Sequence, residues 1–229
     1  MPRQARIAPG GVIYHVLNRA AARQQLFGKV GDYAAFVRVL AQTVQTTQMQ
    51  VCGFCLMPNH WHLVLWPRRD GELARFMQRL TITHVRRWVE HRRRVGYGSV
   101  YQGRYKSFAV EDDRHFNTVL RYVERNPLRA KLVERAQDWR WSSLGQRPTK
   151  QTPLVPLSAW PMPRRPDWMR WVNEPQTAAE EQALRDSLCH GRPFGSASWT
   201  ARMEKALKLG PLRTRGRPRK HPAARKAGK

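Results

Sequence analysis

The sequence predicts an α+β fold followed by a C-terminal extension, and two features of roughly the first 135 residues predict it. Short runs of β-branched and aromatic residues alternate with longer segments whose apolar residues recur at helical spacing. Two of the apolar runs are separated only by Pro58-Asn59, which is typical of a tight hairpin between neighbouring strands. These features indicate a β-α-β-β-α-β-α order.

The first four elements follow from local patterns. Residues 12–17 form a β-branched and aromatic run after the glycines at 10–11, which predicts a strand. A helix over 32–47 is expected because it begins with an acidic residue and has apolar residues three and four positions apart. The apolar runs 50–57 and 60–66 are predicted to be the two strands of the hairpin.

The next elements are a long helix, a strand and a second helix. Apolar residues at helical spacing predict the helix over 71–93, and a strand is expected at 105–111. The acidic pair 112–113 offers an N-terminal cap for the following helix. We expect that helix to end at Asn126, because the residue before a proline, here Pro127, is pushed out of the α region.

The composition changes after about residue 145. Residues 146–167 are rich in proline, which is typical of a linker or of a segment that wraps around a folded unit. Short helices are predicted at 177–188 and 196–209. The tryptophans of this part are expected to pin it onto the preceding residues, since burial of aromatic side chains dominates such packing.

We therefore predict three parts. Residues 1–145 form the main domain, 146–212 form a Pro- and Trp-rich extension with short helices, and 213–229 form a basic tail. The tail consists almost wholly of Arg, Lys, Pro, Gly and Ala, so we expect it to be disordered until it meets nucleic acid.

The charge balance points to a polyanionic partner. Lys and Arg number 42 and Asp and Glu number 16, which gives a formal net charge of +26 and an isoelectric point near 11.5. No apolar run approaches the roughly 20 residues of a membrane-spanning helix, and no signal peptide is evident. A nucleic acid is thus favoured over a membrane, and a cytoplasmic location is expected.

The three cysteines do not indicate a disulfide framework. Cys52 and Cys55 form a C-x-x-C motif, but no second Cys/His pair with zinc-site spacing follows. Positions three apart in a strand also point to opposite faces. Buried structural thiols are the prediction for this pair.

A His-Trp-His motif lies in the second strand of the predicted hairpin. The period of two along a strand places His60 and His62 on one face and Trp61 on the other. Two neutral imidazoles side by side form half of a divalent-metal site. The same pattern also occurs in histidines that are only hydrogen-bonded, so both interpretations remain open at this point.

A tyrosine and an asparagine share one face of the last predicted helix of the main domain. Tyr122 and Asn126 are four residues apart, so both project from the same side. A phenol, a carboxamide ligand and a bound metal would together suffice for transesterification of a phosphodiester. The alternative is a tyrosine at the domain surface and an asparagine that caps the helix.

Four motifs together resemble the REP-associated tyrosine transposases, which belong to the single-tyrosine HUH transposases of bacterial insertion sequences. The resemblance covers at least residues 8–145. The matching runs are Tyr14 to Arg19, Phe54 to Val64, Leu120 to Ala130 and Asp138 to Ser143.

The resemblance implies a ferredoxin-like α/β sandwich with a central antiparallel sheet, the HUH nuclease fold. By matching position, His60, His62 and Asn126 would hold Mg²⁺ or Mn²⁺. Tyr122 would attack a DNA phosphate to give a 5′-phosphotyrosine link and a free 3′-OH. The implied substrate is a single-stranded DNA hairpin, a palindrome of the REP type with a flanking tetranucleotide. A bacterial, nucleoid-associated location is implied, whereas the choice between monomer and homodimer is left undecided.

Basic side chains elsewhere are expected to contact DNA. Arg215-Gly216-Arg217-Pro218 resembles an AT-hook, whose arginines lie in a narrow minor groove, and the alternative for this motif is nonspecific binding to phosphates. Tyrosines at 97, 101 and 105 offer surfaces on which unpaired bases stack. The arginines predicted to bind DNA are Arg19, Arg23, Arg79, Arg86, Arg104, Arg215 and Arg217. The alternative for any one of them is a solvated surface residue.

The sequence thus supports a transposase that acts as a metal-dependent single-strand DNA endonuclease and strand transferase. The alternative is a non-catalytic DNA-binding protein derived from a transposase, and an RNA-binding protein would also explain the charge. The joint presence of His60, His62, Tyr122 and Asn126 favours the enzyme, because a protein that only binds needs no complete set of nucleophile and metal ligands.

Overall fold

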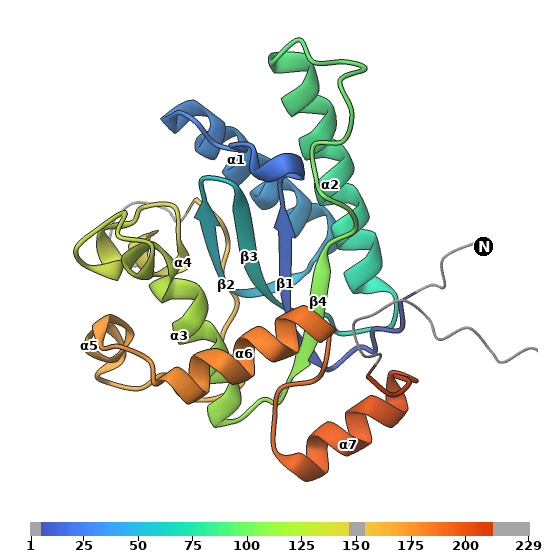
Figure 1. Cartoon of the computed structure of the whole chain (residues 1–229), viewed down its shortest axis with the longest axis vertical. Helices are drawn as coiled ribbons and strands as arrows, with labels where there is room; N and C mark the ends of the chain where they lie inside the picture. Colours follow the sequence, from blue (N-terminus) through green and yellow to red (C-terminus); the bar gives the residue numbers. More distant parts are fainter. Residues whose placement is uncertain (1–5, 147–153, 213–229) are drawn as a thin grey trace, which may run out of the picture.

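The computed structural model describes residues 6–146 and 154–212, apart from the side chain of Arg23. Its fold is α+β, with a four-stranded sheet and helices on both sides (Figure 1). The strands are β1 (Ile13–Arg19), β2 (Gln50–Met57), β3 (His60–Trp66) and β4 (Lys106–Val110). The α-helices are α1 (Val30–Thr47), α2 (Glu72–His91), α3 (Arg114–Arg129), α4 (Ser143–Gln146), α5 (Trp168–Asn173), α6 (Ala178–His190) and α7 (Ala197–Ala206). Two 3-10 helices are η1 (Ala21–Arg23) and η2 (Ala136–Asp138).

The sheet has the order β2-β3-β1-β4, and all its neighbouring strands are antiparallel. This arrangement confirms the predicted ferredoxin-like sandwich and the β-α-β-β-α-β-α order. The hairpin strands β2 and β3 have the predicted bounds. Among the described residues, no helix is both long and apolar enough to span a bilayer.

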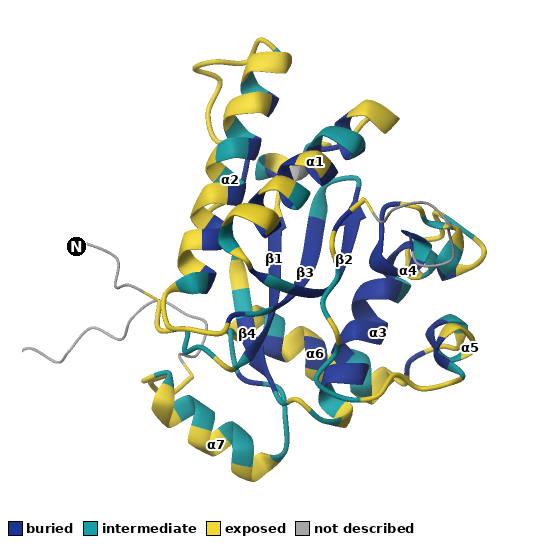
Figure 2. Cartoon of the chain, turned by 180° about the vertical axis from the view of Figure 1, so that it is seen from behind, coloured by how far each residue is buried: buried dark blue, intermediate teal, exposed yellow. Residues whose placement is uncertain are grey.

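The sheet separates two apolar clusters. Helices α1 and α2 cover one face, where Trp61 and Leu63 of β3 are buried. Helix α3 covers the other face with Phe116, Val119 and Leu120, and α5 and α6 lie on the same side (Figures 1 and 2). Consecutive residues of a strand therefore face different layers, and His60 and His62 face α3.

Helix α3 continues past Pro127 and ends at Arg129, so the predicted end at Asn126 is wrong. Proline has no N–H, and it leaves the carbonyl group of Val123 without its usual helical donor. The side-chain amide of Asn126 donates to the Tyr122 carbonyl oxygen at 2.9 Å and lies 3.5 Å from that of Val123. This side-chain amide supplies a donor where the backbone lacks one.

The cysteine prediction is confirmed in part. Cys52 and Cys55 are both buried and form no disulfide. However, both belong to the cluster under α3, so the expectation of opposite faces is wrong. A register shift between Val51 and Gly53 explains this, because an extra residue in one strand interrupts the alternation of side chains.

The C-terminal extension is held against α3 by tryptophans, as predicted. Trp160 packs against Phe116 and donates to the Cys52 carbonyl oxygen at 3.0 Å. Trp168 is 1% exposed and donates to the buried Glu124 carboxylate at 2.8 Å. The described part of the extension therefore contributes to the core on the α3 side, while the division into three domains stays a prediction.

Candidate active site

Side chains from β1, β3 and α3 line a pocket of about 190 Å³ on the α3 side of the sheet. His60 and His62 come from β3, and Tyr122 and Asn126 come from α3. The predicted nucleophile and all three predicted metal ligands therefore lie around one cavity. The other lining residues include Leu17 and Arg19 of β1, Met57 of β2 and Arg129 of α3.

The two histidines of the motif are each oriented by a hydrogen bond at Nδ1. The Nδ1 atom of His60 lies 2.6 Å from Oδ1 of Asn59, and an amide oxygen only accepts, so His60 donates from Nδ1. The Nδ1 atom of His62 lies 2.8 Å from Nε2 of His15 on β1. The Nε2 atom of His62 is buried and has no hydrogen-bond partner among the described residues.

The environment keeps these imidazoles neutral. Burial, together with the nearby charges of Arg19 and Arg129, lowers the pKa of His60 to about 4. Burial also holds the pKa of His62 well below its ordinary value, with His60 and His15 adding to the effect. Neutral imidazole is the form that binds a metal.

Tyr122 and Asn126 share one cationic partner. The guanidinium group of Arg129 donates to the Tyr122 hydroxyl at 3.1 Å and to Oδ1 of Asn126 at 2.8 Å. The Tyr122 ring meets the His62 ring edge to face, with 5.9 Å between the centroids. The phenol is thus next to the predicted metal ligands, although Tyr122 is only 7% exposed.

The residues present fit a divalent metal ion. His60 offers Nε2 once Nδ1 is engaged by Asn59, and the unpartnered Nε2 of His62 is a second donor. Asn126 adds an amide oxygen. Two imidazoles and an oxygen are a mixed donor set that suits a transition ion such as Mn²⁺ better than Mg²⁺, which prefers oxygen ligands. In this structure the guanidinium group of Arg129 donates to Asn126 Oδ1, so its positive charge lies next to that ligand atom.

Two residues that contact the predicted site residues were not predicted from the sequence. His15 is buried, and the pairing of β1 with β3, with Leu17 opposite His62, brings it next to the motif. His15 lies four residues before Arg19 in the first strand, and this even spacing places both side chains on the same face. Only the register shows that His15 meets His62. Arg129 was missed because the helix was expected to end before it. Its spacing of three and seven residues from Asn126 and Tyr122 was the available signal.

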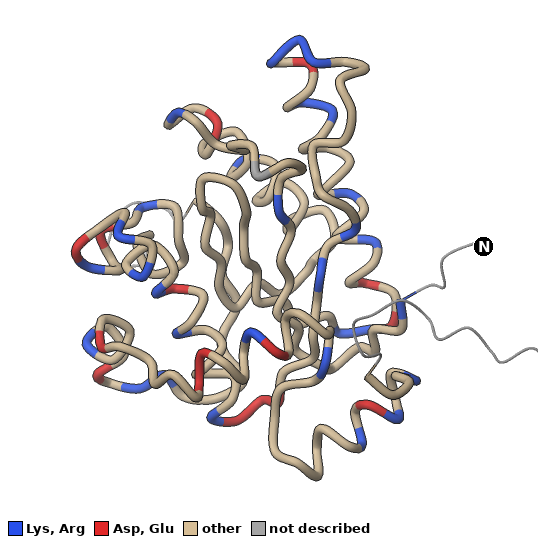
Figure 3. Tube along the Cα trace, viewed as in Figure 1, with Lys and Arg blue, Asp and Glu red and all other residues tan. Residues whose placement is uncertain are grey.

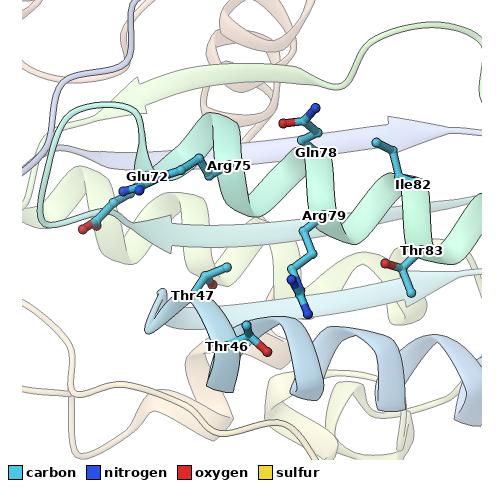
Figure 4. Close-up of a pocket in the computed structure, with 8 residues that line it drawn as sticks. All are labelled: Thr46, Thr47, Glu72, Arg75, Gln78, Arg79, Ile82 and Thr83. Carbon is cyan, nitrogen blue, oxygen red and sulfur yellow. The ribbon is translucent and has the colours of Figure 1, made fainter.

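The arginines predicted to bind DNA are spread over different surfaces. Arg19 lines the candidate active site, whereas Arg79 points from α2 toward the end of α1 in a separate groove of about 650 Å³ (Figure 4). Arg86 and Arg104 line another groove on that face of the sheet. Figure 3 shows that Lys and Arg recur along the length of α2. The side chain of Arg23, and all of Arg215 and Arg217, are outside the described residues.

The three tyrosines differ in exposure. Tyr97 is 73% exposed and Tyr105 is half-buried. Tyr101 is buried, and its hydroxyl is within hydrogen-bonding distance of Trp61 Nε1 and His84 Nδ1. The Tyr101 ring therefore belongs to the core, and the expectation that it offers a stacking surface is wrong.

A second group of potential metal ligands lies at the start of α3. Glu111, Asp113 and His115 have ligand atoms within 4.8 Å of one another. These groups already have partners, because Asp113 caps the His115 amide and the Glu111 carboxylate binds Ser196. The contacts fix the beginning of α3 and the segment before α7, which is a sufficient structural role.

The chain matches the family model described as "Transposase IS200 like" over residues 10–126, just over half its length. It is 25% identical over 111 residues to a Haemophilus influenzae protein assigned to the REP-associated tyrosine transposases. That alignment covers 44% of this chain and 62% of the relative, so the chain spans less than two thirds of the relative's length.

Two solved structures are similar to the fold. One is a REP-associated tyrosine transposase bound to a REP hairpin, with a TM-score of 0.50 and 14% identity over 69% of this chain and 92% of that one. The other, from Deinococcus radiodurans, is assigned as a transposase and has a TM-score of 0.40 and 16% identity over 54% of this chain and 96% of that one. The match over residues 10–126 contains both His60-Trp61-His62 and Tyr122 with Asn126. The chain belongs to the IS200-like transposase family.

Proposed function

We propose that this transposase cleaves and rejoins single-stranded DNA at hairpins and uses Tyr122 as its nucleophile. The observation that carries the proposal is the convergence of Tyr122, Asn126, His60 and His62 on one pocket, although they come from two segments about 60 residues apart. A protein that only binds DNA has no need for a neutral, unpartnered imidazole nitrogen beside a buried phenol.

In the proposed reaction, the Tyr122 oxygen attacks the scissile phosphorus and the bond from phosphorus to the 3′ oxygen breaks. The products are a 5′-phosphotyrosine link and a free 3′-OH. The phenol proton passes to solvent, and the departing 3′ oxygen takes up a proton. A divalent ion held by His60, His62 and Asn126 would polarise the phosphate and neutralise its oxygens. Arg19 and Arg129 add two positive charges to the same pocket, where they bind and orient the phosphate.

The proposed substrate is a DNA hairpin of the REP type with unpaired flanking nucleotides. The structural relative was solved with a REP hairpin, which supports this substrate class. The formal net charge of +26 supports strong binding to phosphates. Both Mg²⁺ and Mn²⁺ remain in the proposal, and the imidazole donors favour Mn²⁺.

The test is cleavage of a labelled hairpin with unpaired flanks, with Mn²⁺, Mg²⁺ or EDTA. We expect metal-dependent cutting and a covalent protein-DNA adduct in the native chain, and neither in Tyr122→Phe. Tyr97→Phe is the matched control, because Tyr97 is an exposed phenol outside the pocket. Hairpin binding without cutting, over a set of palindromes, would instead support the non-catalytic DNA-binding protein.

A further inference from the structure

We propose that a groove between α2 and the segment 99–105 binds an unpaired nucleobase of the DNA strand that is held at Tyr122. The groove has a volume of about 750 Å³ and lies on the face of the sheet opposite the candidate active site. Figure 1 shows the segment running beside α2 before it enters β4. The inference rests on the proposed function, and it adds a site that reads the substrate away from the reacting phosphate.

The floor of the groove is apolar and partly open to solvent. Met77 and Val100 are buried along it, and Ile82 of α2 is 51% exposed. Tyr105 adds a half-buried aromatic ring, over which the Arg6 guanidinium group stacks at 4.2 Å. A base has two apolar faces and a polar edge, so a floor of this kind removes the faces from water.

One polar side chain from β1 lines this apolar surface. Asn18 of β1 is 6% exposed, and its Oδ1 accepts from the Arg19 backbone amide at 3.0 Å. This contact fixes the amide orientation, because a backbone N–H needs an acceptor. Asn18 Nδ2 forms no hydrogen bond to any described residue, although Asn18 lines the groove. This donor is accessible from the groove, so it can donate to an acceptor on the ligand, such as a carbonyl oxygen of thymine or guanine.

The charge around the groove matches a nucleic acid strand. Arg6, Arg86 and Arg104 line it and are exposed, and no acidic side chain of the described residues lines it. Phosphates of a bound strand would meet these guanidinium groups while a base enters the apolar floor.

Strand β1 contributes residues to both the groove and the candidate active site, which lie on its two faces. Leu17 and Arg19 of β1 line the active-site pocket, and Asn18 between them lines the groove, because successive side chains point to opposite faces. The edge of the sheet between the two sites carries the exposed Arg104 and Lys106. A strand bound at Tyr122 that bends around this edge places a neighbouring nucleotide at Asn18.

The experiment measures binding by fluorescence anisotropy, so that it does not depend on cleavage. The protein is the full chain carrying Tyr122→Phe, with Mn²⁺ present. The probe is a labelled hairpin with a short run of thymidines on either side, and a single abasic site is moved through the unpaired positions. Each probe is measured with the Tyr122→Phe protein and with the same protein carrying either Ile82→Ser or Asn18→Asp in addition. Val30→Ser is the matched control, because Val30 is 63% exposed on α1, outside the groove.

We expect one unpaired position at which loss of the base weakens binding about tenfold, as for a stacked base. In Ile82→Ser and in Asn18→Asp, the abasic site at that position should weaken binding by less than about twofold. In Val30→Ser it should still weaken binding about tenfold. Thermal melting confirms that each variant is folded. The proposed base-binding role of the groove would be overturned if no abasic site weakened binding, or if the weakening persisted in both groove variants. Neither result would bear on the chemistry proposed for Tyr122. Adduct formation by the native chain tests that chemistry separately.

Discussion

The Nδ1 atom of His62 lies 2.8 Å from the Nε2 atom of His15, and this contact sets how the His62 ring faces the pocket. When His62 donates from Nδ1, its Nε2 carries a lone pair toward the proposed metal position. Partners of this kind orient metal-binding histidines and fix their tautomer. His15 would therefore act on the proposed metal site through His62, without being a ligand itself.

Replacement of His15 should weaken metal binding according to what the new side chain accepts. We expect His15→Leu to raise the dissociation constant for Mn²⁺ by about 10- to 100-fold, because nothing accepts the His62 proton. His15→Gln offers an acceptor oxygen to His62, so its dissociation constant for Mn²⁺ should rise less than that of His15→Leu. The measurement is titration of Mn²⁺ followed by electron paramagnetic resonance, with melting of the metal-free proteins as the folding control. Equal affinities in the native protein and His15→Leu would disprove the orienting role.

Arg129→Gln should separate metal binding from cleavage. In the absence of DNA, the guanidinium group sits 2.8 Å from the proposed ligand atom Asn126 Oδ1, where its charge repels a cation. The variant should thus bind Mn²⁺ more tightly without DNA, by a fewfold, yet cleave more slowly because the phosphate loses a cationic partner. Arg135→Gln, at an exposed arginine outside the pocket, is the control. Weaker Mn²⁺ binding by Arg129→Gln would contradict the competition.

Gly53→Ala should destabilise the fold where α3 crosses β2. A Cβ atom at this position would lie 2.3 Å from Leu120 Cδ1 and 3.0 Å from Ser143 Oγ, so the fully buried Leu120 side chain would have to shift within the core. Overpacking of this kind typically costs about 1 to 3 kcal/mol of unfolding free energy. Gly103→Ala is the matched control, because a Cβ there would have no atom within 4 Å among the described residues other than its two chain neighbours. Urea denaturation of the two variants gives the comparison, and equal midpoints would show that α3 packs less tightly than the structure indicates.

Acid should destabilise the protein in part through His84. Burial lowers the pKa of His84 to about 3, against the attraction of Asp32, so the folded state excludes a proton that the unfolded state binds below about pH 6.5. The stabilisation is therefore complete above that pH and is lost as the pH falls toward 3.

The variant His84→Gln should reduce the slope of unfolding free energy against pH by up to about 1.4 kcal/mol per pH unit between about pH 4 and 6. Glutamine keeps an acceptor for the Tyr101 hydroxyl, which lies 2.7 Å from His84 Nδ1. His91→Gln, an exposed histidine on the same helix, serves for comparison. The measurement is urea denaturation at a series of pH values, and an unchanged slope in His84→Gln would show that His84 titrates normally in the folded protein.

Local sequence patterns were sufficient to predict the order of the helices and strands. They also predicted each of the two residue pairs that form the candidate site, though not their contact with each other. A period of two placed His60 and His62 on one face of β3, and a spacing of four placed Tyr122 and Asn126 on one face of α3. Both periods are properties of a single segment, so they can be read without knowledge of the rest of the chain. The same holds for the hairpin at Pro58-Asn59, where the turn residues are adjacent in sequence.

Only the tertiary structure decided which side chains from different strands and helices contact one another. The register of β1 against β3 brings His15 to His62, and the continuation of α3 past Pro127 brings Arg129 to Tyr122 and Asn126. It also decided that Arg19 and Arg86 lie on opposite faces of the sheet. Pairing register and helix packing depend on the burial of whole faces and on side-chain donors such as that of Asn126. These contributions to the free energy come from residues far apart in sequence, and no local pattern contains them.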